Sequence, residues 1–167
     1  MTLHNLNTLP ESEFKQALLN CCGSTAWVNK MYALLPFEDL VELLNDAEEQ
    51  WYQCSEADWL QAFAHHPKIG DIDSLKKKFA ATAQWAGSEQ GTVAQASEQT
   101  LQQLAEGNDA YEKKFGFIFI VCATGKSAAE MLAMLQQRLP NSREEEVQIA
   151  AGEQNTITQL RIQKLLA

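Results

Sequence analysis

Apolar residues recur with helical spacing along almost the whole chain, and this pattern limits the fold more than any other feature. One helix face opens after Pro10 with the spacing i, i+3, i+4, i+7 and carries Phe14, Ala17, Leu18 and Cys21. A second face, predicted to open behind Pro36 with Glu38 and Asp39 in its first turn, carries Phe37, Leu40, Val41, Leu44 and Trp51. These stretches predict amphipathic helices.

Residues 117–121, with the sequence Phe-Ile-Phe-Ile-Val, form the one stretch with the character of a strand. A single strand cannot make a sheet, so we expect a buried extended segment or a helix there. The sequence shows no internal repeat, low-complexity stretch or long linker. We therefore predict one all-α domain over residues 1–167, a bundle of about seven to nine helices.

Capping signals predict where several helices begin and end. Ser55 with Asp58 resembles a capping box before Trp59. Pro140 is expected to end a helix, because proline cannot continue one. The start signal recurs before two later helices, at Ser127 with Glu130 and at Ser142 with Glu145.

Composition narrows the class of protein. With 46% hydrophobic and 21% charged residues the chain is ordinary for a globular protein, and its net charge of -9 argues against nucleic acid as a partner. No leader-like stretch and no apolar run of about 20 residues is present, so we expect a cytoplasmic protein that does not cross membranes. The cysteines lack Cys-x-x-Cys spacing, which favours reduced, packed thiols.

The pair His66-Pro67 is the first candidate for chemistry. The proline ring excludes the helical region for the residue before it, so the helix predicted over residues 59–64 must stop near His66. Histidine titrates nearest neutrality, and a ring on a stiff turn suits proton transfer. The alternative is a structural histidine that caps the carbonyl end of its helix.

A second candidate is the Glu89-Gln90 pair between Gly87 and Gly91. Glycines let a ligand approach the backbone closely, while the carboxylate can accept hydrogen bonds and the amide can donate and accept. The alternative is an ordinary helix start with Ser88 as its cap.

Arg161 is the third candidate because it shares a helical stripe with the apolar residues Ile157 and Leu165. An arginine in such a stripe either reaches into a pocket to bind an anion or lays its stem along the edge of the core.

The sequence gives little evidence for a phosphate-binding loop, a metal site or a nucleophile elbow. Residues 123–127 imitate a phosphate-binding loop, but position 120, where that loop needs glycine, holds isoleucine. Histidine and cysteine spacing does not fit a metal site, and no nucleophile elbow is present, so we expect no metal. Acid-base chemistry remains.

Several segments, taken in order, resemble one known family. They are His66-Pro67-Lys68-Ile69-Gly70; Trp85 with Glu89-Gln90; Tyr111-x-x-x-Phe115-Gly116-Phe117-x-Phe119; Arg138-Leu139 with Asn141; and Glu146, Ala150 and Glu153 before Ile157 and Leu160-Arg161. In this order they resemble the 2-oxo-4-hydroxy-4-carboxy-5-ureidoimidazoline (OHCU) decarboxylases of urate catabolism. The resemblance covers nearly the whole chain.

The resemblance implies an all-helical homodimer that needs no cofactor and converts OHCU, a small ureidoimidazoline, to (S)-allantoin and carbon dioxide. It implies that His66 is the catalytic proton donor, assisted by Glu89 and by Arg161, which either binds substrate or orients Glu89. The implied substrate contacts are Pro67, Ala86, Gly87, Ser88, Glu89, Gln90, Phe119, Ile120, Val121, Cys122 and Ala123. The chain departs from the family at Ala86, where many members have a serine; Ser88 is out of register.

Two other functions are compatible with the sequence. Within enzymes, the chain would be a lyase or hydrolase for another ureido or hydantoin-type ring. From a different class, it would be a non-catalytic helical interaction module, which has no need of His66, Glu89 and Arg161.

Overall fold

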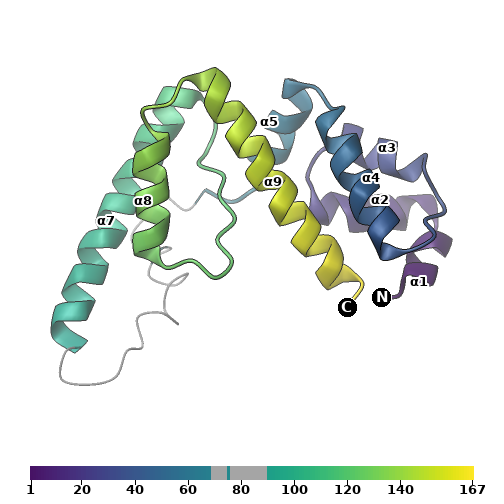
Figure 1. Cartoon of the computed structure of the whole chain (residues 1–167), viewed down its shortest axis with the longest axis horizontal. Helices are drawn as coiled ribbons and strands as arrows, with labels where there is room; N and C mark the ends of the chain where they lie inside the picture. The colour runs from purple at the N-terminus through teal and green to yellow at the C-terminus, as the bar shows by residue number, and fades with distance from the viewer. Residues whose placement is uncertain (69–74, 76–89) are drawn as a thin grey trace. The chain divides into compact units, whose positions relative to one another are not determined.

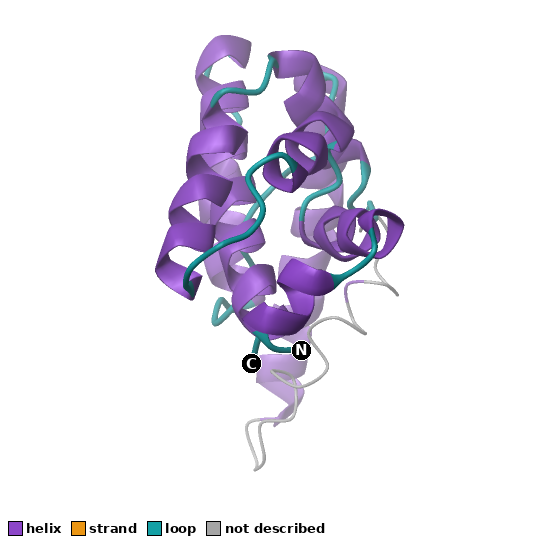
Figure 2. Cartoon of the chain, turned by 90° about the vertical axis from the view of Figure 1, so that its right-hand side faces the viewer, coloured by secondary structure: helices purple, strands orange, loops and turns teal. Residues whose placement is uncertain are grey.

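The computed structural model describes residues 1–68, Leu75 and residues 90–167 (Figure 1). Within these ranges the chain forms eight helices and no strand, which confirms the all-α prediction (Figure 2). The helices are α1 (Leu3–Thr8), α2 (Glu11–Cys21), α3 (Thr25–Tyr32), α4 (Leu40–Tyr52), α5 (Glu56–Ala64), α7 (Gln90–Phe115), α8 (Ala128–Arg138) and α9 (Arg143–Leu165).

The chain divides into two compact units. The first unit comprises Met1–His66 together with Ile149–Ala167, and the second comprises Pro67–Gln148. Helix α9 contributes its first turns to the second unit and the rest of its length to the first. Of the helices in the described ranges, none is both long enough and apolar enough to span a lipid bilayer.

Buried tryptophans tie together the helices of the first unit. The indole of Trp27 on α3 donates to the carbonyl oxygen of Ala47 on α4 at 2.9 Å. The indoles of Trp51 and Trp59 donate to the carbonyl oxygens of Ala151 and Trp51, each also at 2.9 Å. A buried indole N–H without a partner is costly, so these bonds fix how α3, α4, α5 and α9 pack.

The helix boundaries follow the predicted capping signals. Ser55 and Asp58 form the reciprocal capping box at the start of α5. Ser127 caps α8, and that helix ends at Arg138, two residues before Pro140. The Ser142 hydroxyl accepts from the backbone N–H of Glu145 at 3.2 Å, at the start of α9.

The predicted apolar face of α4 is wrong in its start and its register. The helix begins at Leu40 with Asp39 as its N-cap, so Phe37 is buried outside it. Val41 is 65% exposed, and the buried face of α4 carries Leu43, Ala47 and Trp51. Two overlapping apolar stripes run through this part of the sequence. Packing against the tryptophans buries the stripe that differs from the predicted helix face.

The second unit pairs α7 with α8. At Gly107 on α7 a Cβ atom would lie 2.4 Å from Leu135 Cδ2 on α8, so a larger residue there would have to displace the Leu135 side chain. Helix α7 ends at Phe115, and Gly116, with a φ of 81°, turns the chain into residues 117–123. These residues form neither strand nor helix; Phe117, Ile120 and Cys122 are buried, which confirms a largely buried non-helical segment.

Candidate active site

His66 lies where the sequence places it, just beyond the end of α5. The helix stops at Ala64, His65 is its C-cap, and the backbone N–H of His66 donates to the carbonyl oxygen of Phe63 at 3.2 Å. The His66 side chain is half-buried, whereas His65 and Pro67 are exposed. The imidazole of His66 is therefore partly sheltered from solvent and mounted on a turn that the proline stiffens.

A buried amide on α9 holds the His66 ring. His66 Nε2 lies 2.5 Å from Gln154 Oε1, across 88 positions of sequence. Gln154 is fully buried, and its Nε2 donates to Thr158 Oγ1 one turn later at 3.1 Å. Thr158 is in turn hydrogen-bonded to the thiol of Cys22. We call these four residues the His66 chain.

The thiols near this chain are inert. Burial raises the pKa of Cys22 to about 12, although the hydrogen bond from Thr158 opposes the shift. Burial likewise raises the pKa of Cys21 and of Cys54 to about 11. All four cysteines are free and buried, as the sequence predicts, and these three stay protonated near neutral pH.

Arg161 lies on the same side of α9 as Gln154 and Thr158, because residues seven apart fall on one helix face. Its side chain is exposed, and Nη1 lies 3.5 Å from the carbonyl oxygens of Asn20 and Cys21. These carbonyls end α2, where a cation is favoured. Both contacts are long and use a single nitrogen, so they do not require the planar fork of arginine.

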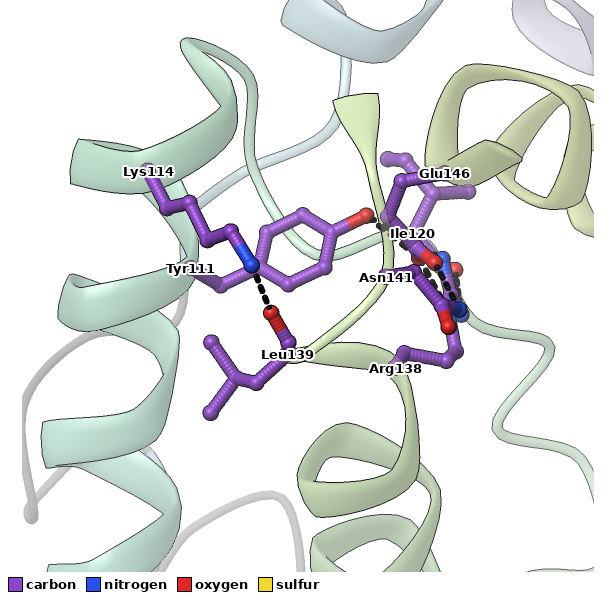
Figure 3. Close-up of polar contacts among 7 residues, drawn as sticks. All are labelled: Tyr111, Lys114, Ile120, Arg138, Leu139, Asn141 and Glu146. Atoms are coloured by element: carbon purple, nitrogen blue, oxygen red, sulfur yellow. Dashed lines mark hydrogen bonds and ion pairs between the residues drawn. The ribbon is translucent and has the colours of Figure 1, made fainter. Parts of the chain in front are cut away.

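A buried ion pair in the second unit holds the segment 117–123. Glu146 on α9 is fully buried and pairs with Arg138 Nε at the end of α8. Arg138 Nη1 donates to the carbonyl oxygen of Ile120 at 2.7 Å (Figure 3). The pair thereby fixes the backbone of this segment at its middle residue.

Neutral groups complete this second network. The Tyr111 hydroxyl donates to Glu146 Oε1 at 2.8 Å, and Asn141 Nδ2 donates to Oε2 at 3.0 Å (Figure 3). Burial raises the pKa of the Tyr111 phenol, and the Glu146 carboxylate adds to the shift. The phenol therefore stays protonated and remains a donor. We call Tyr111, Ile120, Arg138, Asn141 and Glu146 the Arg138 cluster.

Aromatic rings cover the guanidinium of this cluster. Its central carbon lies 4.6 Å from the centre of the Phe119 ring and 5.7 Å from that of Tyr111. The two rings meet edge to face, with centres 5.2 Å apart. A desolvated cation over aromatic faces gains from cation–π attraction. The side chain of Phe119 and the backbone of Ile120 are thus both fixed by Arg138.

The structure describes only some of the remaining predicted site residues. Residues 86–89, Ala-Gly-Ser-Glu, lie outside the described residues. Gln90 is the first residue of α7, and its side chain is likewise outside the described part. Val121 and Ala123 are half-buried, and Ile120 and Cys122 are buried. Among the described residues no group of three His, Cys, Asp or Glu side chains is placed to hold a metal ion.

Sequence reasoning missed the partners that position these side chains. Gln154 and Thr158 interrupt the buried positions Ala150, Ala151 and Ile162 of α9, and polar residues on such a face were the available signal. The motif residues Tyr111, Arg138, Asn141 and Glu146 were noted, but their mutual contacts were not predicted.

Known proteins share the sequence and the fold of this chain. A model of the family described as OHCU decarboxylase matches residues 7–163. The chain is 43% identical over 151 residues to the uric acid degradation bifunctional protein TTL of Arabidopsis thaliana, covering 88% of this chain but only 45% of that longer protein. It is 25% identical to the 2-oxo-4-hydroxy-4-carboxy-5-ureidoimidazoline decarboxylase of Haloferax volcanii, covering 97% of this chain and 94% of that protein.

A solved structure agrees with these matches. A crystal structure of OHCU decarboxylase in the presence of (S)-allantoin superposes with a TM-score of 0.71 and 39% identity, covering 89% of this chain and 95% of that chain.

Proposed function

The chain belongs to the OHCU decarboxylase family, and on that basis we propose that it converts OHCU to (S)-allantoin and carbon dioxide in urate degradation. Relatives and a structural neighbour named for this activity support the proposal, and the neighbour was crystallised with (S)-allantoin. The observation that carries it in this chain is the half-buried imidazole of His66, held by Gln154 at 2.5 Å.

The reaction needs proton transfer more than an electron sink. When the bond between the ring and its carboxylate breaks, the electron pair moves into the adjacent ring C=N, whose nitrogen takes up a proton. The ring hydroxyl loses its proton and becomes a carbonyl, and the carbon that bears the ureido group gains one. The substrate thus accepts its own electron pair, so the enzyme must orient it and move protons.

We assign the proton transfer to His66. Its imidazole exchanges a proton with the ring hydroxyl as carbon dioxide leaves. The same ring, or a water that it orders, then protonates one face of the enamine-like intermediate and so sets the S configuration. A rigidly mounted ring suits this task because stereochemical control requires a fixed direction of proton delivery.

The substrate contacts are assigned by likeness to the family. We propose that backbone groups of residues 119–123 recognise the amide groups of the substrate, a task for which the Arg138 cluster holds that backbone rigid. We propose that Glu89 and Gln90 bind the ureido and ring N–H groups, with Pro67 and residues 86–88 beside the ring. Arg161 binds an anionic group of the substrate or orients Glu89.

We further propose that the protein is a cytoplasmic homodimer, as the family resemblance implies. The oligomeric state is tested by light scattering on the eluting peak of a gel-filtration run. A mass near twice 18.7 kDa supports the dimer, and a mass near 18.7 kDa contradicts it.

The proposed activity is tested with freshly generated OHCU. Circular dichroism follows the appearance of optically active product with and without the protein. Optical activity that rises faster with the protein, with the sign of (S)-allantoin, supports the proposal. An unchanged rate contradicts it, and consumption of a different ureido or hydantoin-type ring would favour the alternative lyase or hydrolase.

A further inference from the structure

We infer that Gln154 fixes the tautomer of His66, keeping the proton on Nε2 so that Nδ1 is the nitrogen that exchanges protons with the substrate. The contact that carries this inference joins His66 Nε2 to Gln154 Oε1 at 2.5 Å. The role of Nδ1 in the reaction rests on the proposed function, whereas the tautomer itself does not.

The orientation of the Gln154 amide follows from its other partner. Thr158, one turn further along α9, offers a hydroxyl oxygen that accepts from the amide. Gln154 Nε2 donates to it at 3.1 Å, and this turns Oε1 toward the imidazole.

The imidazole must then be the donor in its contact with Gln154. An amide oxygen can only accept, so Nε2 of His66 carries a proton whether the ring is neutral or charged. In the neutral ring the lone pair lies on Nδ1, and on protonation the second proton goes there. Nε2 thus keeps its proton throughout, and Nδ1 alone gains and loses one.

Burial makes the arrangement hard to reverse. Gln154 is fully buried and Thr158 is 3% exposed, so a flipped amide would set its NH₂ group against the Nε2 proton with no water to compensate. Unmatched buried donors are costly. Gln154 is accordingly a positioning residue: it acts on the reaction through His66.

The test is nitrogen NMR of the full-length protein labelled with ¹⁵N in histidine, recorded without substrate above the titration of the rings. The chain has three histidines, and the signals lost in His66→Asn identify the pair of interest. We expect Nε2 of His66 to be of the protonated, pyrrole type and Nδ1 of the unprotonated, pyridine type. The reverse assignment, or an even mixture, overturns the inference.

Variants separate orientation from general structure. Gln154→Glu keeps an acceptor and retains the Nε2–H form, whereas Gln154→Met removes it and yields a mixture of tautomers. Gln159→Met is the matched control, because Gln159 lies on the same helix but donates to the carbonyl oxygen of Leu44 at 2.9 Å. Thermal unfolding confirms that each variant is folded. A Gln154→Met spectrum that matches the wild type overturns the inference.

Measuring turnover of OHCU distinguishes failure of the proposed function from failure of the tautomer inference. In Gln154→Met we expect kcat for OHCU to fall at least ~10-fold with KM little changed, by analogy with the loss of other groups that orient a catalytic histidine. If the wild type fails to turn over OHCU yet shows the Nε2–H tautomer, only the proposed function fails. If it turns over OHCU with the opposite tautomer, only this inference fails.

Discussion

The His66 chain of the first unit and the Arg138 cluster of the second use buried polar groups in opposite ways. The His66 chain passes from a half-buried imidazole through a neutral amide and a hydroxyl to a protonated thiol. The Arg138 cluster sets a full positive charge against a full negative charge, both buried. An amide orients an imidazole without placing a charge beside it, whereas an ion pair locks the charge of both partners.

This difference matches two different tasks, proton exchange at His66 and structural support by the Arg138 cluster. A residue that exchanges protons must be able to change its charge, and the Gln154 amide that holds His66 carries no charge of its own. The Arg138 cluster fixes a backbone and a ring, a task for which an unchanging charge serves well. We therefore expect damage to the cluster to appear first in stability, and damage to His66 to appear in turnover.

The largest effect on stability is expected for Glu146→Gln. This change leaves Arg138 buried without a counter-charge and should lower the free energy of unfolding by about 3–5 kcal/mol. Urea unfolding of the full chain measures it. The matched control is Glu144→Gln, an exposed acid in the same helix turn, which should cost less than about 1 kcal/mol. Equal losses in the two variants would show that the ion pair does not hold the second unit.

Tyr111→Phe should have an intermediate effect. It removes the hydroxyl that donates to Glu146 at 2.8 Å and keeps the ring contacts with Phe119. The loss of a hydrogen bond to a charged group is expected to lower the free energy of unfolding by about 2 kcal/mol. Tyr52→Phe is the control, since Tyr52 is 48% exposed. A Tyr111→Phe protein as stable as this control would contradict the proposed cluster.

The buried thiol of the His66 chain predicts a pH dependence. The folded pKa of Cys22 is raised from 9.0 to about 12, so between these values the folded state binds more protons than the unfolded state. Stability is therefore lost as the pH rises above 9, by up to about 1.4 kcal/mol per pH unit. In Cys22→Ser this contribution disappears, and the difference in unfolding free energy between wild type and variant should shrink between pH 8 and pH 10. Parallel curves would contradict the shift.

The smallest effect on stability is expected for Arg161→Lys. The arginine contacts the end of α2 through one nitrogen at 3.5 Å, and a lysine can replace such a contact at a cost below about 0.5 kcal/mol. Turnover should nevertheless fall if the guanidinium binds a planar anionic group, because lysine cannot form the paired contact. Unchanged turnover with unchanged stability would leave Arg161 with the helix-capping role alone.

Local sequence signals predicted the helices more completely than they predicted the site. Proline and capping residues act on neighbours within one turn, so the ends of α5, α8 and α9 could be predicted from the sequence. The register of α4 could not, because Leu40, Val41, Leu43 and Leu44 offer two apolar faces and only packing against distant tryptophans decides between them.

Partners distant in sequence explain what was missed at the site. His66 was identifiable from its proline, but Gln154 lies 88 residues away and carries no local signature of its role. Arg138 and Glu146 are close in sequence, yet their connection to Tyr111 and Ile120 depends on how α7 and the segment 117–123 fold back. Such contacts arise from tertiary packing, which periodicity does not encode.

The central claim, that His66 moves the proton, is tested most directly by His66→Asn with freshly generated OHCU. Asparagine keeps a polar group near the position of Nδ1, although it is too short to replace the Nε2 contact with Gln154, and it cannot exchange a proton near neutrality. The rate at which (S)-allantoin appears by circular dichroism should fall at least ~100-fold, while urea unfolding shows that the variant is folded. A folded His66→Asn protein that forms (S)-allantoin at the wild-type rate would contradict the account.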